Sequence, residues 1–134
     1  MSENPLRGVV AGLRSGALAM AALAFLLLGG WAMFANAGAP LQAALASGLA
    51  QGIVCAAAVL AMKPALRALR GSLSGAAALI APPLIVAAMS LAALVIAHLI
   101  VRTPEIARAI TPAAAGVLIY AGVLSFISSG KRRG

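Results

Sequence analysis

Four long stretches without Lys, Arg, Asp or Glu are the feature that most constrains the fold of this chain. They cover about residues 15–35, 41–62, 75–101 and 109–129. Each could cross the ~30 Å hydrocarbon core of a bilayer as an α-helix, which takes about 20 apolar residues. Membrane strands would instead give ~10-residue segments of alternating polarity, and the sequence has none. It therefore predicts an all-α integral membrane bundle of four transmembrane helices, forming a single domain over residues 1–134.

The composition agrees with a membrane protein. Hydrophobic residues make up 63% of the chain and charged residues 9%, whereas soluble domains are roughly one quarter charged. The net charge of +8 could suggest a nucleic-acid partner. However, the basic residues flank the apolar stretches, and aromatic residues, at 4%, are too few to provide stacking platforms for bases. We therefore expect membrane lipids as partners and no nucleic acid.

The distribution of Lys and Arg predicts the orientation in the membrane. With four spans, eight of the ten basic residues fall on one side. These eight are Arg7, Arg14, Lys63, Arg67, Arg70, Lys131, Arg132 and Arg133, and the other side has Arg102 and Arg108. Because cytoplasmic loops are enriched in Lys and Arg, both termini are predicted to be cytoplasmic. The richness in Ala, Gly and Arg is typical of a GC-rich bacterium, so we expect the bacterial inner membrane.

The links between the stretches contain turn residues. The segment NAGAP, residues 36–40, is so short that the first two helices must be antiparallel neighbours. Residues 63–75 and 102–108 form the other two links. The stretches GIVCAAAVL (52–60) and GVLIYAGVL (116–124) share residues at matched positions. The two halves are therefore either related helical hairpins or alike by chance, as happens in Ala-rich sequences.

The N-terminal segment also allows a second interpretation. Two arginines, an apolar run and the small residues Ala35-Asn36-Ala37 imitate a signal peptide with its cleavage site. The apolar run is longer than an ordinary signal core, so a retained membrane span is the favoured interpretation.

Small residues at four-residue spacing predict close helix packing. Such residues let two backbones approach each other, which drives helix association in lipid. The candidate packing residues are Gly12, Gly16, Ala44, Gly48, Gly52 and Gly116. They could pack within one bundle, or they could form the face of a homo-oligomer or of a larger membrane-protein complex.

Two adjacent prolines, Pro82 and Pro83, lie near the start of the third stretch. They lack the backbone N–H groups that would bind the carbonyls of Ala78 and Leu79. The pair therefore predicts either a simple kink or a functional hinge.

Two groups of polar residues are candidate sites. Gln51, Ser90 and Tyr120 fall near the middles of their stretches and could form one midplane hydrogen-bond cluster.

The second group is His98, Arg102 and Glu105, predicted on the external side. If the helix continued they would share one face, and His98 and Arg102 could then hold an anionic group such as a lipid phosphate. Alternatively, Thr103 caps the fourth helix, with Pro104 in its first position and Glu105 in its first turn, so that these residues only anchor helix ends.

No catalytic, metal or cofactor site is predicted. Glu3 and Glu105 are the only acidic residues, and Cys55, the only cysteine, lies in an apolar run where it packs as a small hydrophobe. The chain has the size of four-span proton-coupled efflux pumps of the small multidrug type. Those pumps use a carboxylate in the first span, and residues 15–35 contain none. The remaining expectations are a non-catalytic accessory or structural subunit, and alternatively a small oligomeric transporter or lipid-handling protein for an amphipathic or anionic lipid-like substrate.

Overall fold

The computed structural model describes residues 16–130 and contains, within that range, four helices and no strand. These helices are α2 (Ala17–Ala35), α3 (Leu41–Gly71), α4 (Ala77–Ile100) and α5 (Ile106–Gly130). Each is long and apolar enough to cross a membrane, α5 over Ile106–Ile127. The chain is therefore a multi-pass membrane protein with the predicted all-helical, four-span fold.

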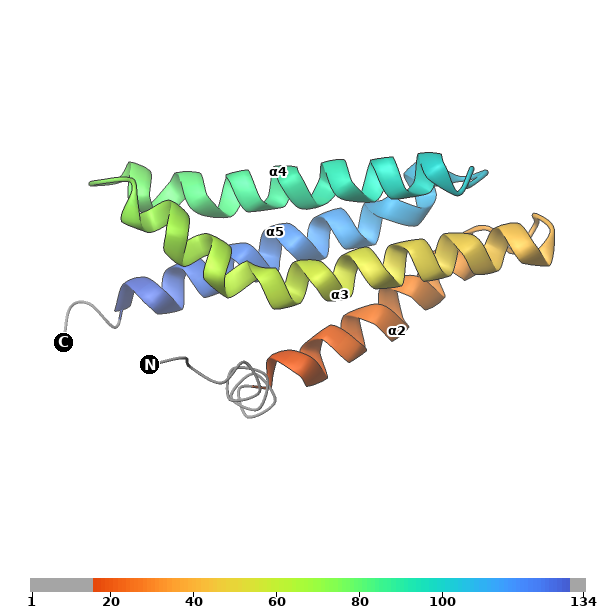
Figure 1. Cartoon of the computed structure of the whole chain (residues 1–134), viewed down its shortest axis with the longest axis horizontal. Coiled ribbons are helices and arrows are strands. Elements are labelled where there is room, and N and C mark those ends of the chain that lie inside the picture. The colour runs from red at the N-terminus through yellow and green to blue at the C-terminus, as the bar shows by residue number, and fades with distance from the viewer. Residues whose placement is uncertain (1–15, 131–134) are drawn as a thin grey trace, which may run out of the picture.

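The helices pack as two antiparallel hairpins (Figure 1). Each helix contacts the next one along the chain, and α5 returns against α2 and α3. We call the end with residues 36–40 and 101–105 the turn end, and the end with residues 72–76 the α3–α4 end. At the turn end, the α2–α3 hairpin projects beyond the α4–α5 hairpin (Figure 1). This offset decides which polar residues meet inside the bundle.

Helix α3 is longer than the sequence suggested. Residues 63–75 were predicted as a link, but the helix continues to Gly71 with Pro64 inside it. Proline removes only one backbone donor, whereas the Ala, Leu and Arg residues that follow are strong helix formers. The extension also packs, since Met62 and Leu66 form a buried cluster with Val86 and Ala121. Burial of these side chains, which the local composition did not reveal, stabilises the extra turns.

Glycines bring α2 and α3 into close contact. A Cβ atom on Gly29 would lie 2.7 Å from the Gly48 carbonyl oxygen and 3.3 Å from the Gly52 Cα atom. A Cβ atom on Gly52 would lie 2.8 Å from the ring of Phe25. The predicted small-residue face of α3 therefore packs within the chain, where Ala44 is also buried.

Two predicted packing glycines have no such role. The space beside Gly16 and Gly116 is open, with no atom within 4 Å of an added Cβ. Gly16 has φ +70° and precedes α2, where a residue without a Cβ adopts the left-handed conformation easily. Gly12 lies outside the described residues.

Helix α4 runs through both prolines, and the Pro82 side chain is buried. Pro83 leaves the Leu79 carbonyl without its intrahelical donor. Ser125 on α5 donates its hydroxyl to that carbonyl over 3.2 Å. Arg70 of α3 in turn donates to the Ser125 hydroxyl over 2.5 Å and to the Ser125 carbonyl. A proline-freed carbonyl thus becomes part of a contact among three helices, which we call the Arg70 cluster (Arg70, Ser125 and the Leu79 carbonyl).

The same arrangement occurs in α5. Pro112 frees the Arg108 carbonyl, and Trp31 of α2 donates its indole N–H to this oxygen over 3.0 Å. We predict that Trp31→Phe lowers the unfolding free energy by about 1 kcal/mol, because one interhelical hydrogen bond is lost. In a Pro112→Ala background the backbone supplies the missing donor, so the same substitution should cost clearly less. Unfolding in mixed detergent micelles, followed by circular dichroism, measures both values, and an equal cost in both backgrounds would contradict this account.

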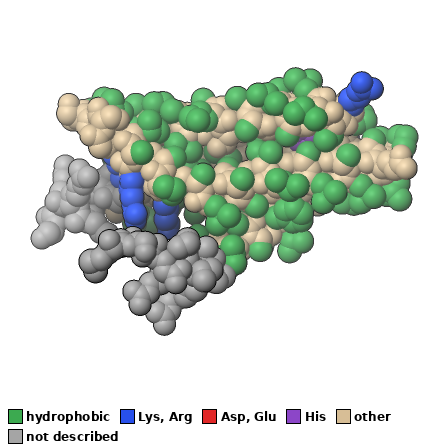
Figure 2. All heavy atoms as spheres, in the orientation of Figure 1, with side chains coloured by type: hydrophobic (Ala, Val, Ile, Leu, Met, Phe, Trp, Pro, Cys, Tyr) green, Lys and Arg blue, Asp and Glu red, His purple; other side chains and the backbone are tan. Residues whose placement is uncertain are grey.

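Apolar side chains cover the visible face of the bundle, and Lys and Arg side chains occur only toward its two ends (Figure 2). Large hydrophobic residues such as Leu26, Met89 and Phe126 are more than 60% exposed. Hydrocarbon tails solvate such a surface well, which is consistent with a bundle that lies in a membrane.

Candidate functional site

A buried polar network lies near the turn end and joins α3, α4 and the α4–α5 turn. Its centre is His98, which has 0% exposure, as has Gln51. His98 Nε2 lies 2.7 Å from Gln51 Oε1, and His98 Nδ1 lies 2.7 Å from Thr103 Oγ1. Ser47 Oγ extends the network, 3.0 Å from Thr103 Oγ1. We call these four side chains the His98 network.

The donors and acceptors of the His98 network follow from its surroundings. Gln51 Nε2 donates to two carbonyls, of Leu28 on α2 over 3.1 Å and of Ala109 on α5 over 2.8 Å. The amide oxygen of Gln51 must therefore face His98 and accept from its Nε2–H. With a neutral imidazole, Nδ1 then accepts the Thr103 hydroxyl proton, and the single Ser47 hydroxyl proton is shared between Thr103 Oγ1 and the Ala43 carbonyl oxygen 2.8 Å away. Gln51 thus makes contact with all three other helices.

The end of α4 explains how Thr103 reaches His98. The Thr103 N–H binds the His98 carbonyl over 2.9 Å, and Arg102 adopts φ +53°. This is the Schellman arrangement, with Arg102 in the left-handed position that glycine usually takes. The tight reversal turns Thr103 back onto the imidazole. The Thr103 hydroxyl therefore serves the network, and α5 begins only at Ile106.

Asn36, in the first turn, links the two hairpins. It is buried, donates to the Ala32 carbonyl over 2.9 Å and accepts the Glu105 backbone N–H over 2.9 Å. A side chain from the other hairpin therefore satisfies a backbone donor just before α5. The sequence predicted Thr103 in this capping role, because a threonine just before a helix usually caps that helix.

The predicted external group does not come together. His98 points into the bundle, whereas Arg102 and Glu105 are exposed. Within residues 16–130, no ion pair joins Arg102 to Glu105. The helix ends at Ile100, so the three residues do not share one helical face. A phosphate at Arg102 would not reach the imidazole, whose two nitrogens are already bonded.

The predicted midplane group is also divided. Ser90 donates to Val86 of its own helix over 2.8 Å, and Tyr120 is half-buried beside the Met62 and Leu66 cluster. Gln51 instead meets His98. Because the first hairpin projects at the turn end, a residue ten positions into α3 lies level with one near the end of α4 (Figure 1). The sequence gives no sign of this offset.

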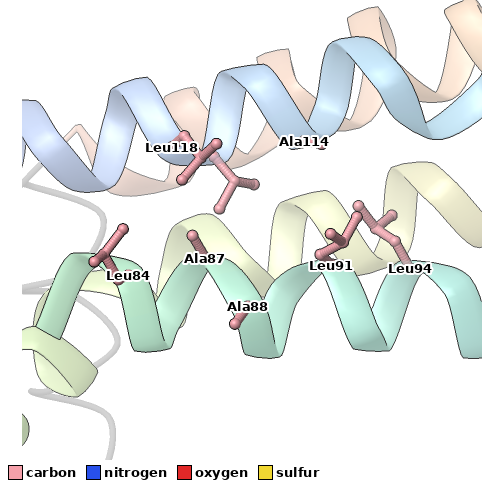
Figure 3. A pocket seen from close by; sticks show the side chains of 8 residues that line it. Leu84, Ala87, Ala88, Leu91, Leu94, Ala114 and Leu118 are labelled. Atoms are coloured by element: carbon pink, nitrogen blue, oxygen red, sulfur yellow. The ribbon is translucent and has the colours of Figure 1, made fainter. Parts of the chain in front are cut away.

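The apolar hollows of the described residues include one of about 470 Å³ at the turn end, beside Gly30, Phe34 and Leu41, and two grooves between the helices. One, of about 210 Å³, runs between Leu84–Leu94 of α4 and Ala114–Leu118 of α5 (Figure 3). The other, of about 240 Å³, lies between α2, α3 and α5 in the half of the bundle nearer the α3–α4 end. We call the second the α2–α3–α5 groove. Both can accept hydrocarbon.

The network and the grooves define what the arrangement can do chemically. The described residues include no group of three His, Cys, Asp or Glu side chains that could hold a metal ion. Cys55 is buried in the wall of the α2–α3–α5 groove.

Comparison with protein-family models, curated proteins and solved structures gives no match.

Proposed function

We propose that this protein is a non-catalytic accessory or structural subunit of a membrane complex, in the inner membrane of a bacterium and with both termini in the cytoplasm. The observation that supports it most is that hydrogen bonds between polar groups join the helices at both ends of the bundle. The His98 network joins the helices at the turn end, and the Arg70 cluster joins α3, α4 and α5 at the other. These interactions hold the four helices in a fixed arrangement, as a scaffold requires.

The remaining surface also suits an assembly role. Interhelical hydrogen bonds and glycine contacts use the small and polar residues inside the bundle, and the outer face is almost wholly apolar. In lipid, helices associate through close packing rather than through the hydrophobic effect. The groove between α4 and α5, where Ala87, Ala88 and Ala114 lie among leucine side chains, offers an apolar recess for such packing.

Native mass spectrometry of the protein, extracted in a mild detergent from its source membrane, tests this function. We expect one heavier assembly that contains defined foreign subunits at whole-number ratios to this chain. A bare monomer or homo-oligomer in repeated extractions would contradict the accessory role.

A second candidate function is the handling of an amphipathic lipid. The observation that favours it is the α2–α3–α5 groove, which has an apolar lining. Its α3 wall is followed along the same helix by the exposed cations Lys63 and Arg67. In this case the same experiment should show a homo-oligomer or monomer that retains lipid.

A further inference from the structure

The α2–α3–α5 groove is short enough to lie within one leaflet. Its walls run from Met20 to Leu28 on α2, from Cys55 to Met62 on α3 and from Gly116 to Tyr120 on α5. At 1.5 Å per residue, the α2 wall is about 12 Å long. A partner helix that crosses the bilayer would need a groove of about 30 Å. A groove of less than half that length instead suits part of an acyl chain within one leaflet.

Small residues keep this groove open. Ala24, Ala58 and Gly116 come from three different helices and line it. Nothing lies within 4 Å of the position that a Gly116 Cβ would take. The groove is therefore unfilled space, and not a gap that neighbouring side chains close.

Cations continue the line of the groove toward the α3–α4 end. Lys63 follows the groove residue Val59 by four positions and Arg67 follows it by eight, so all three lie on one stripe of α3. Lys63 is therefore about 6 Å beyond Val59 along the helix axis, one turn away. Both cations are exposed, and within residues 16–130 neither forms an ion pair. Arg70, by contrast, is directed into the bundle toward Ser125.

The positive charges of Lys63 and Arg67 favour an anionic occupant of the groove. The chain has two acidic residues; Glu105 is at the turn end, and Glu3 lies outside the described residues. The groove between α4 and α5 provides an internal comparison, since α4 itself has no Lys or Arg over Ala77–Ile100 and Arg70, which approaches this helix, is already bonded to Ser125. Apolar space within one leaflet, followed by two cations one and two helical turns further along α3, matches a phospholipid with an anionic headgroup.

We propose that the α2–α3–α5 groove is a binding site for one anionic phospholipid, with an acyl chain between Ala24, Ala58 and Gly116 and the headgroup phosphate at Lys63 and Arg67. This inference rests on the second candidate function, lipid handling, and names its site and its ligand class. It moves the anionic site from His98 and Arg102 at the turn end to the opposite end of the bundle.

The test is a native mass spectrometry titration of the delipidated full chain with phosphatidylglycerol and, separately, with phosphatidylcholine of the same acyl chains. We expect a Kd for phosphatidylglycerol about thirtyfold lower than that for phosphatidylcholine, as two cations near an anionic headgroup predict. The double substitution Lys63→Gln and Arg67→Gln should remove this preference. The matched control, Arg102→Gln and Arg108→Gln, removes the same charge at the turn end and should keep it.

Filling the groove tests the position of the acyl chain. Gly116→Leu should raise the Kd for both lipids about tenfold, the effect of roughly two methylene groups losing their buried site. Its control is Gly122→Leu, also on α5 and beside open space but outside the groove, and it should leave both values unchanged. Ala24→Leu fills the groove from the α2 wall and serves if Gly116→Leu unfolds the protein.

The outcomes separate the site from the function. Equal Kd values for the two lipids, or an equal loss of preference in the turn-end control, would overturn the phosphate site. Unchanged Kd values in the groove-filling variants would overturn the acyl-chain site. In either case lipid binding by the protein would stand elsewhere on its surface. If the delipidated protein binds neither lipid, both the site and the lipid-handling function fail.

Discussion

Gly29→Leu is expected to lower the unfolding free energy by about 3 kcal/mol, the upper end of the usual cost of overpacking. The added Cβ would meet the Gly48 carbonyl oxygen at 2.7 Å and the Gly52 Cα atom at 3.3 Å. Both are backbone atoms of α3, so no side-chain rotation can relieve the contact. The two helices must move apart, which breaks the close packing that stabilises helix pairs in lipid.

Gly30→Leu is the matched control for this prediction. Gly30 is the next residue of α2, and the space beside it is open. Its replacement should change stability by less than about 0.5 kcal/mol, as exposed substitutions usually do. Unfolding in mixed micelles with increasing dodecyl sulfate, followed by circular dichroism, gives both values. Similar values for the two variants would show that α2 and α3 are not held together at Gly29.

Gln51→Leu is expected to cost about 2 kcal/mol. The substitution removes three hydrogen bonds to other helices, each worth ~0.6 kcal/mol in a membrane protein, and leaves the buried Nε2–H of His98 without an acceptor. Ser90→Ala removes a bond only to Val86 of the same helix, so it should cost less than about 0.5 kcal/mol. The same unfolding assay compares the two variants.

A double-mutant cycle identifies the cause of the Gln51 effect. His98→Leu alone leaves Gln51 Oε1 unpaired, whereas the double variant removes both partners. The double variant should therefore be more stable, by about 1 kcal/mol, than the sum of the single effects predicts. Strict additivity would mean that the contact between Gln51 and His98 contributes nothing of its own.

The sequence was a sufficient guide to the helices, because a membrane span is a local property. The length and polarity of residues 77–100, for example, are readable without knowing what they contact, and α4 agrees closely with the predicted stretch 75–101. The prediction for α3 stopped too early at Met62. Its last turns carry charges, and they are helical because Leu66 packs against α4 and α5. The orientation of the termini and the relation between the two hairpins stay predictions.

The candidate sites were less predictable, for a geometric reason. Glycines at four-residue spacing on α3 pointed correctly to a close contact, since spacing within one helix fixes a face. The partner of that face, Gly29, depends on how α2 is rotated. Likewise, Pro82 and Pro83 predicted free carbonyls at Ala78 and Leu79, but nothing in the sequence indicated that Ser125 would bind the Leu79 carbonyl.

The sequence by itself determined that this protein is four apolar helices with their charges near the ends, because hydrocarbon solvent imposes length, helicity and charge position on each segment separately. Only the tertiary structure decided that His98 meets Gln51 rather than Arg102, and that a groove opens beside Lys63. One residue along a helix changes the direction of a side chain by about 100° and its height by 1.5 Å. The rotation and offset of the helices, fixed by packing over the whole bundle, therefore decide which polar groups meet.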